Sequence, residues 1–350
     1  MSLQLPAAIE RLSAAWLGGD AVRAWSLAAG GFSGASLYAV EHLATGRRFV
    51  LKRFPASATI DRCIWVHALM RQLRAAGIDV VPEVTDRPGA TGESRTFLVD
   101  HQGGPWELVA FMPGRGTERP TAGQAAAAVQ SLARLHVAAA AWIDGRQTHG
   151  PAPGVIRRRE QARQLLALPW RQRRAAIAGD ADPVVVAIFD QAIDVFENRS
   201  GARSLEAIAA AESGALPLQP VLRDVWSDHV LFDEHGGRVT GIVDYHAAAI
   251  DTPATDLARL LGSWSLAGER CELPLLEAWR DAIDAYEEVR PLAPAERRLI
   301  PWLHATGVIL GLDNWFRWTL EERRTFPDVD RMHERIARLV AALGPALAWQ

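Results

Sequence analysis

The spacing of hydrophobic residues changes about one third of the way along this 350-residue chain. Between about Arg23 and Phe111, short or alternating apolar runs predict strands at residues 36–40, 49–52, 96–99 and 108–111. One helix is predicted among them, from about Asp61 to Ala76, and Gly77 follows where a helix end favours positive φ. The first third of the chain therefore predicts a β-rich unit with one helix.

After Met112-Pro113-Gly114 the apolar residues recur at helical spacing. This periodicity predicts helices at residues 121–142, 183–198, 271–288 and 294–322. The exception is residues 218–245, where short apolar runs at 221–222, 230–232 and 239–243 predict a small sheet inside a helical lobe. We expect an α+β protein with an N-terminal lobe at residues 1–106, a linker at 107–114 and a larger, mainly helical lobe at 115–350.

Composition and charge exclude several classes of protein. Hydrophobic residues make up 49% of the chain and charged residues 23%, which is typical of a folded protein. The net charge of −3 comes from 38 basic and 41 acidic residues that are interspersed, so nucleic-acid binding is not expected. No apolar run approaches the roughly 20 residues needed to span a bilayer, and Met1–Gly18 does not resemble a signal peptide. We expect a cytoplasmic protein with no membrane partner.

Two smaller features, the cysteines and one basic stretch, are explained without any specific function. Cys63 and Cys271 have no second thiol or histidine at metal-binding spacing, so neither a disulfide framework nor a zinc site is predicted. The basic stretch Arg157-Arg158-Arg159 lies in a segment that favours a helix, and we interpret it as a solvated helix face. A patch that steers anions is the alternative.

Four features, taken in order along the chain, predict phosphoryl transfer. A glycine-rich hairpin at residues 30–36 would let backbone N–H groups approach phosphates, although a hairpin without a ligand is the commoner explanation of such a loop. Lys52 ends an apolar strand, where it is either solvated or paired with an anion. Asp224 and Asp244 each follow a predicted strand, and kinase chemistry needs one carboxylate to accept the hydroxyl proton and one to hold a metal ion. Turn aspartates are the alternative for both.

These motifs resemble the aminoglycoside, choline and homoserine kinase superfamily, which has a bilobal protein-kinase-like fold. Three further segments match its pattern: residues 132–136, ending in His136, the turn at 251–253, and 256–259, beginning with Asp256. The resemblance implies an ATP- or GTP-dependent O-phosphotransferase acting on a small polar metabolite or antibiotic. Its partners would be a nucleotide and a small-molecule hydroxyl acceptor.

The resemblance also implies a role for each site residue. The predicted nucleotide contacts are Gly31, Ser33, Gly34, Lys52 and, through the backbone of the linker, Glu107 and Ala110. Asp224 would be the catalytic base, and Asp244 and His229 would be metal ligands. Asp256 is predicted to anchor the catalytic loop, and His136 to be a buried structural histidine.

Three departures from the family pattern leave an alternative open. His229 stands where asparagine is usual, Leu222 where histidine is usual, and the helix at 61–76 has no glutamate to pair with Lys52. Because imidazole suits Mn²⁺ better than Mg²⁺, the metal would be Mg²⁺ or Mn²⁺, or else one ion held by Asp228 and Asp244. The alternative function is a nucleotide-binding pseudokinase that regulates or binds a partner.

A cationic acceptor is expected to need a pocket lined by carboxylates. The candidates in the helical lobe are Asp228, Glu272, Glu277, Asp281, Glu321 and Glu322. All six are explained equally well as exposed helix charges, so the sequence leaves the acceptor open.

Overall fold

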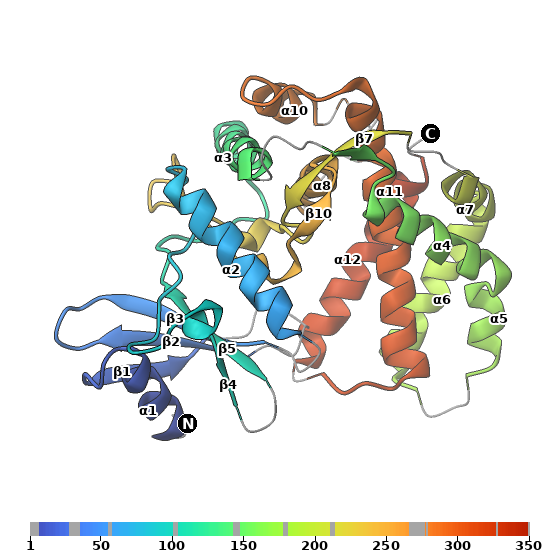
Figure 1. The fold of residues 1–350 in the computed structure, drawn as a ribbon. Coiled ribbons are helices and arrows are strands. Elements are labelled where there is room, and N and C mark those ends of the chain that lie inside the picture. The colour runs from blue at the N-terminus through green and yellow to red at the C-terminus, as the bar shows by residue number, and fades with distance from the viewer. Residues whose placement is uncertain are drawn as a thin grey trace. The chain divides into compact units, whose positions relative to one another are not determined.

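The structure, a computed structural model, describes residues 7–27, 36–54, 58–100, 104–142, 148–177, 181–210, 214–265, 277, 279–326 and 328–348. Its contacts divide the chain into two units (Figure 1). Unit 1 holds Met1–Arg115 and His229–His246, and unit 2 holds Gly116–Asp228 and Ala247–Gln350. Residues 229–246 are therefore packed with the N-terminal segment. The lobe and linker boundaries expected from the sequence stay a prediction.

Unit 1 is built on an antiparallel sheet with the strand order β1-β2-β3-β5-β4. Its elements are α1 (Ala7–Trp16), β1 (Val22–Ser26), β2 (Ser36–His42), β3 (Arg48–Arg53), α2 (Ile60–Ala75), the 3₁₀ turn η1 (Glu93–Thr96), β4 (Leu98–Val99), β5 (Pro105–Ala110), β8 (Val230–Phe232) and β9 (Val239–Ile242). Alternating residues of the central strands, such as Phe49 and Leu51 in β3, are buried with Trp16 and Leu108 in one hydrophobic cluster. This core holds β3, and with it Lys52, in place.

Local sequence signals explain where α2 begins and ends. The Thr59 side chain accepts a hydrogen bond from the Arg62 N–H at 3.3 Å, as an N-cap residue does. Gly77, just beyond the last turn, has φ +82°, a conformation that glycine adopts without steric cost. The helix predicted at residues 61–76 is confirmed.

Unit 2 is mainly helical and contains a three-stranded sheet with the order β10-β7-β6. Its elements are α3 (Ala122–Trp142), β6 (Thr148–Gly150), α4 (Pro153–Ala167), α5 (Trp170–Ala175), α6 (Pro183–Asn198), α7 (Gly201–Ala210), β7 (Leu216–Val221), β10 (Ala249–Asp251), α8 (Ala254–Ser265), α10 (Arg280–Glu287), α11 (Pro294–Phe316), the π-helical turn η4 (Arg317–Glu321) and α12 (Val329–Leu347). Two 3₁₀ turns, η2 (Ser227–His229) and η3 (Tyr245–Ala247), join the units along the chain.

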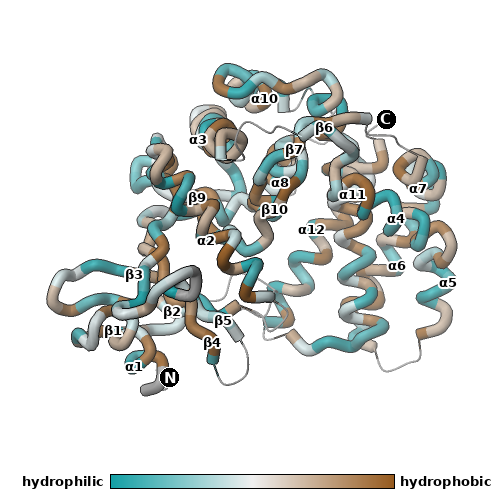
Figure 2. The backbone as a smooth tube through the Cα atoms, viewed as in Figure 1, coloured by the Kyte–Doolittle hydropathy of each residue, from teal (hydrophilic) through white to brown (hydrophobic). Residues whose placement is uncertain are grey.

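The outer helices of unit 2, such as α6 and α12, bury one face, whereas α8 and most of α11 are buried on nearly every side. Brown and teal segments alternate along α4, α6 and α12 in Figure 2, as amphipathic helices require. Asp182 caps α6 by accepting from the N–H groups of Val184 and Val185, and Asp328 caps α12 by accepting from Arg331 at 2.9 Å. The helices predicted at 121–142, 183–198 and 294–322 are confirmed, the last of them as α11 followed by η4.

Two expectations about the elements were wrong, the pairing of the strands between residues 218 and 245 and the length of the strand at residues 96–99. The strands between residues 218 and 245 do not form one sheet, because β7 pairs with β6 and β10 whereas β8 pairs only with β9. The strand predicted at residues 108–111 is present as β5, which begins earlier, at Pro105, and ends at Ala110. The predicted strand at residues 96–99 is two residues long, and Thr96 ends the preceding 3₁₀ turn. Residues 271–276 lie outside the described residues, and the described helix that follows them, α10, begins at Arg280.

Candidate active site

Lys52 and Asp244 form a buried ion pair in unit 1. Lys52 lies in β3 and is 7% exposed, and its Nζ is 2.5 Å from Oδ1 of Asp244, which follows β9. The ammonium group also lies 5.1 Å from the centre of the Phe54 ring, a cation–π distance. The helix α2 has no glutamate that could pair with Lys52, and the anionic partner of Lys52 is Asp244 instead.

Two histidines surround the carboxylate of Asp244. His246 places Nδ1 2.7 Å from Oδ1, and His229 places Nε2 4.0 Å from Oδ2. Burial alone would raise the pKa of Asp244, but Lys52 and the hydrogen bond with His246 outweigh burial and hold this pKa well below its usual range. Asp244 is therefore a carboxylate at any working pH. Its backbone has φ +68°, an uncommon conformation that often marks a functional site.

The donors around Asp244 can hold part of a metal coordination shell. Oδ2 of Asp244 and Nε2 of His229 are separated by more than hydrogen-bond distance, which leaves room for an ion between them. No group of three His, Cys, Asp or Glu side chains within the described part of the chain is arranged to hold a metal ion. A metal at this position would need further oxygen ligands, such as phosphates and water.

The helix α2 is tied to the sheet through a histidine. His67 is 2% exposed, and its Nε2 lies 2.7 Å from Oε2 of Glu107 while its Nδ1 lies 2.8 Å from Oγ1 of Thr96. Glu107 is the cross-strand neighbour of Lys52. Sequence analysis missed this link, although His67 was visible on the helix that lacks a glutamate.

The predicted contacts of the Glu107 and Ala110 backbone with the nucleotide stay a prediction. The Glu107 side chain is held by His67, and the N–H of Ala110 donates to the carbonyl of Glu83 at 2.8 Å. The predicted contacts Gly31, Ser33 and Gly34 lie outside the described residues.

Asp224 lies in unit 2, three residues after the end of β7. Its Oδ1 accepts a hydrogen bond from Nε1 of Trp226 at 2.8 Å and lies 3.5 Å from Nε of Arg259. The residue before it, Arg223, has φ +66°, a conformation that is costly for a side chain with a Cβ. The loop is therefore held in a specific shape that orients the Asp224 carboxylate.

Hydrogen bonds to Asp256 hold this loop in its shape. The fully buried carboxylate of Asp256 accepts from the N–H of Leu222 at 2.7 Å and from the N–H of Arg223 at 2.5 Å. Nε2 of His136 lies 3.0 Å from the same carboxylate, and Nδ1 of His136 lies 2.7 Å from the Tyr286 hydroxyl. Burial lowers the pKa of His136, so the neutral ring donates from Nε2 and accepts from Tyr286. The predicted structural roles of Asp256 and His136 are confirmed.

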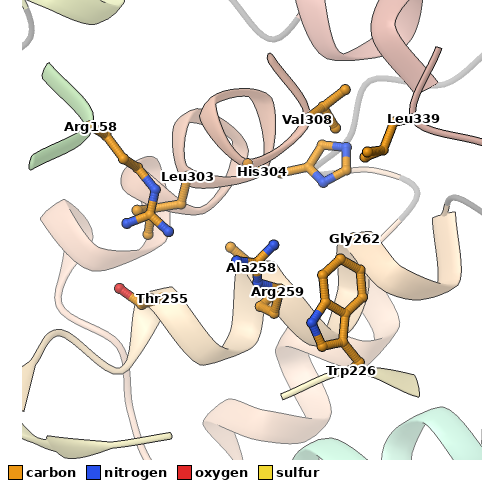
Figure 3. Close-up of a pocket in the computed structure, with 11 residues that line it drawn as sticks. Arg158, Trp226, Thr255, Ala258, Arg259, Gly262, Leu303, His304, Val308 and Leu339 are labelled. Atoms are coloured by element: carbon orange, nitrogen blue, oxygen red, sulfur yellow. The ribbon is translucent and has the colours of Figure 1, made fainter. Parts of the chain in front are cut away.

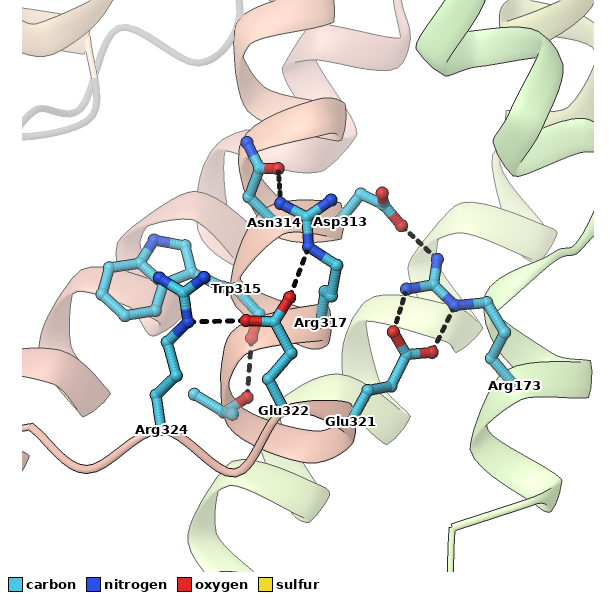
Figure 4. Close-up of polar contacts among 9 residues, drawn as sticks. Arg173, Asp313, Asn314, Trp315, Arg317, Glu321, Glu322 and Arg324 are labelled. Atoms are coloured by element: carbon cyan, nitrogen blue, oxygen red, sulfur yellow. Dashed lines mark hydrogen bonds and ion pairs between the residues drawn. The ribbon is translucent and has the colours of Figure 1, made fainter. Parts of the chain in front are cut away.

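Two carboxylates that could have received a cationic acceptor are paired with arginines (Figure 4). Glu321 binds Arg173 through both oxygens, at 2.7 and 3.0 Å, and Glu322 lies 3.1 Å from Arg317 and 2.6 Å from Arg324. Glu277 lies 3.6 Å from Arg280, and Glu272 lies outside the described residues. The ion pairs of Glu321 and Glu322 join the end of α11 and η4 to arginines, so neither carboxylate is free to receive a cationic acceptor.

The structure brings Lys52, His229 and Asp244 together in unit 1 and places Asp224 in unit 2. Sequence analysis missed His246, although its position two residues after Asp244 was a usable signal, and it also missed Trp226 and Arg259 beside Asp224. None of the described helices is both long enough and apolar enough to cross a bilayer.

Comparisons with known proteins agree with this chemistry. The model of the phosphotransferase enzyme family matches residues 26–292. A homoserine kinase of Xanthobacter autotrophicus is 28% identical over 262 residues, which cover 75% of this chain and 71% of that protein. A homoserine kinase of Caulobacter sp. is also 28% identical, over 74% of this chain and 71% of its own. These relatives are named as enzymes and give no support to the pseudokinase alternative.

Solved structures show the fold. A spectinomycin phosphotransferase, in complex with ADP and spectinomycin, has a TM-score of 0.65 with 13% identity, covering 100% of both chains. An amicoumacin kinase, in complex with AMP-PNP and Ca²⁺, has a TM-score of 0.60 with 12% identity, covering 97% of this chain and 92% of that one. The expected α+β kinase-like fold is confirmed.

Proposed function

This chain belongs to the phosphotransferase enzyme family, and we propose that it moves the γ-phosphate of ATP or GTP onto a hydroxyl group of a small polar molecule. It is a phosphotransferase with a hydroxyl group as acceptor, as its family and its homoserine kinase relatives are. The observation that carries the proposal within this chain is the ion pair between Lys52 and Asp244.

Unit 1 supplies the groups that suit a nucleotide. Lys52 is a buried ammonium group whose present partner is a carboxylate, and it would exchange part of that interaction for phosphate oxygens. Asp244 stays ionised beside it because its pKa is held low. A cation and a fixed carboxylate next to each other match a phosphate chain that carries a divalent metal.

The metal would be held by Asp244 and His229. An Mg²⁺ or Mn²⁺ ion bound there would neutralise charge on the β- and γ-phosphates during transfer. Because His229 offers a nitrogen donor, which Mn²⁺ accepts more readily than Mg²⁺, we expect Mn²⁺ to support turnover at least as well as Mg²⁺. Lys52 balances the charge of Asp244 when no ion is bound.

Unit 2 supplies the base. The acceptor hydroxyl oxygen attacks the γ-phosphorus, the bond from that phosphorus to the bridging oxygen of the β-phosphate breaks, and the hydroxyl proton passes to Asp224. Trp226 and Arg259 fix Oδ1 of Asp224, so the carboxylate keeps one orientation without a bound substrate. The products are a phosphate ester and a nucleoside diphosphate.

The proposal is tested by nucleotide binding and turnover in the wild-type protein and in Asp244→Ala. Thermal shift with ATP or GTP, each with Mg²⁺ and with Mn²⁺, reports binding, and release of phosphate or nucleoside diphosphate reports turnover. We expect metal-dependent stabilisation and turnover in the wild type and the loss of both in the variant. Absence of nucleotide binding with either metal, or a fully active Asp244→Ala protein, would contradict the proposal.

A further inference from the structure

The two carboxylates of the proposed active site are held in different ways. Asp224, in unit 2, is held by side chains, since Trp226 donates to its Oδ1 and Arg259 lies 3.5 Å from the same oxygen. Both side chains also line a small cavity (Figure 3), whose volume of about 20 Å³ leaves room for little more than water, which needs roughly 10–15 Å³. Asp244, in unit 1, is held through its backbone as well, by an arginine of helix α2.

The two oxygens of Asp244 have different surroundings. Oδ1 accepts from Nζ of Lys52 at 2.5 Å and lies 2.7 Å from Nδ1 of His246. Because an ionised carboxylate can only accept, Nδ1 is a nitrogen of His246 that carries a proton. Oδ2 accepts no hydrogen bond from the described residues and lies 4.0 Å from Nε2 of His229. The two donors on Oδ1 therefore leave Oδ2, on the side of His229, for an ion.

The backbone around Asp244 must be held in place by its neighbours. Asp244 has φ +68°, which is uncommon for a residue with a Cβ. On its N-terminal side, the N–H of Val243 donates to the carbonyl of His229 at 2.9 Å. On its C-terminal side, the turn η3 begins with Tyr245, which is buried. A strained conformation persists only when contacts on both sides fix it.

Arg62 fixes the backbone on the C-terminal side. Its Nε and Nη2 donate to the carbonyl of His246, at 3.2 and 3.1 Å. Two donors of one rigid, planar guanidinium on the same oxygen restrict both the position and the direction of this peptide group. The carbonyl belongs to the last residue of unit 1 before the chain passes into unit 2. Arg62 thus holds the residue whose ring contacts Asp244.

Arg62 is itself held by a fixed helix. It lies in the first turn of α2, and its backbone N–H donates to the side chain of Thr59, the N-cap residue. Six residues of α2 are buried, and one of them, His67, has Nε2 2.7 Å from Oε2 of Glu107 in β5. Because the helix is anchored to the sheet of unit 1, the contact of Arg62 transmits a fixed position to His246.

Helix stability alone does not explain an arginine at position 62. The N-terminal end of a helix carries partial positive charge, so a cation in the first turn is disfavoured. Arg74, in the last turn of α2, lies where the helix dipole favours a cation, and its Nη1 donates to the carbonyls of Asp79 and Val81, at 2.9 and 3.4 Å. The contact with His246 accounts for Arg62, which opposes the dipole.

We propose that Arg62 and His246 are positioning residues for the metal-binding carboxylate. Arg62 fixes the peptide group of residue 246, His246 holds Oδ1 of Asp244, and Oδ2 is left facing His229 for the divalent ion. Helix α2, which has no glutamate for Lys52, acts on the site through an arginine instead. This inference rests on the proposed function, because it concerns the ion that phosphoryl transfer requires.

The test compares Arg62→Gln, which removes the guanidinium, with Arg62→Lys, which keeps a charged donor. Arg74→Gln is the matched control, because it removes an arginine that binds backbone carbonyls at the other end of the same helix. Binding of Mn²⁺ in the presence of ADP is measured by electron paramagnetic resonance of free Mn²⁺, and binding of ADP without metal by calorimetry. We expect Mn²⁺ affinity to fall about 10-fold in Arg62→Gln, with part of the loss recovered in Arg62→Lys.

The affinity for ADP without metal should be nearly unchanged in all three variants, and Arg74→Gln should bind Mn²⁺ as the wild type does. Hydrogen exchange in the ligand-free protein then reports on the backbone directly. We expect the amide hydrogens of residues 244–248 to exchange about 10-fold faster in Arg62→Gln than in the wild type. The same amides should keep their wild-type rates in Arg74→Gln.

Two variants of His246 distinguish a positioning residue from a metal ligand. Asparagine places an N–H group close to the position of Nδ1, so His246→Asn keeps a donor for Asp244, whereas His246→Leu removes it. We expect Mn²⁺ affinity near that of the wild type in His246→Asn and about 10-fold lower affinity in His246→Leu. An equal loss in both variants would make the ring a ligand of the ion and would overturn its positioning role.

The outcomes separate the inference from the function on which it rests. If the wild-type protein binds no Mn²⁺ in the presence of ADP, the inference falls together with the metal role in the proposed function. If the wild type binds Mn²⁺ and Arg62→Gln binds it as tightly, only the inference is overturned. Equal losses of Mn²⁺ affinity in Arg62→Gln and Arg74→Gln would overturn it as well, since they would reflect the stability of α2 alone.

Discussion

Asp256 is not proposed to touch the substrate. Replacing it by asparagine tests whether it shapes the active site from a distance. Asp256 is fully buried and accepts from the N–H groups of Leu222 and Arg223 and from His136. An asparagine offers only one carbonyl oxygen, so at least one of these donors would face an N–H group. The loss of a hydrogen bond to a charged group, together with an unsatisfied buried donor, lowers the free energy of unfolding by about 2–5 kcal/mol.

We expect this change to lower both stability and rate. For a unit of this size the loss corresponds to about 5–15 °C in Tm. Arg223 would no longer be held at its positive φ, and Asp224 would move with it, so we expect kcat to fall by about 100-fold while the KM for nucleotide changes little.

The assays are thermal unfolding followed by circular dichroism and steady-state formation of nucleoside diphosphate. Asp328→Asn is a matched control, because Asp328 caps α12 and asparagine caps a helix as well as aspartate does. An Asp256→Asn protein whose Tm and kcat match those of the wild type would refute this explanation of the loop.

Three further predictions concern Lys52, His229 and His304. Lys52→Met should raise the KM for nucleotide by about 10-fold or more, as measured by titration, and an unchanged KM would remove Lys52 from phosphate binding. His229→Asn should shift the metal preference of turnover from Mn²⁺ towards Mg²⁺, and an unchanged Mn²⁺/Mg²⁺ rate ratio would exclude His229 as a ligand. The pKa of His304 is about 4 in the folded protein because of burial and Arg259, whereas unfolded histidine titrates near 6.5. Its contribution to stability is therefore complete above about pH 6.5 and is lost as the pH falls towards 4, by about 3 kcal/mol. Urea unfolding at several pH values should show this fall in the free energy of unfolding in the wild type. The fall should be smaller in His304→Gln.

Local patterns in the sequence were sufficient to predict most helices and strands. The helix at α6 has an aspartate cap, a proline in its first turn and helical apolar spacing, and its predicted bounds match the structure. The strands β8 and β9 were also predicted, because each is a short apolar run beside polar turns. How these strands pair was not predictable, since pairing depends on contacts between distant segments.

The candidate site shows the same limit. Lys52, Asp224 and Asp244 could be identified from residue type and order along the chain. The pairing of Lys52 with Asp244 joins residues 192 positions apart, and no local pattern reveals it. Arg158 was interpreted as part of a solvated helix face, which was wrong for this residue because α4 buries it. Burial of a charge in a helix of mixed composition depends on which face the neighbouring helices cover, and this information is not present in the helix itself.

The measurement that tests the central claim most directly is phosphoryl transfer by Asp224→Asn, with nucleotide binding measured on the same protein. Asparagine has the shape of aspartate but cannot take the hydroxyl proton. The account predicts that transfer to the acceptor is lost while the affinity for ATP stays within about two-fold of the wild type. Wild-type transfer by Asp224→Asn would contradict the role of Asp224 as the base.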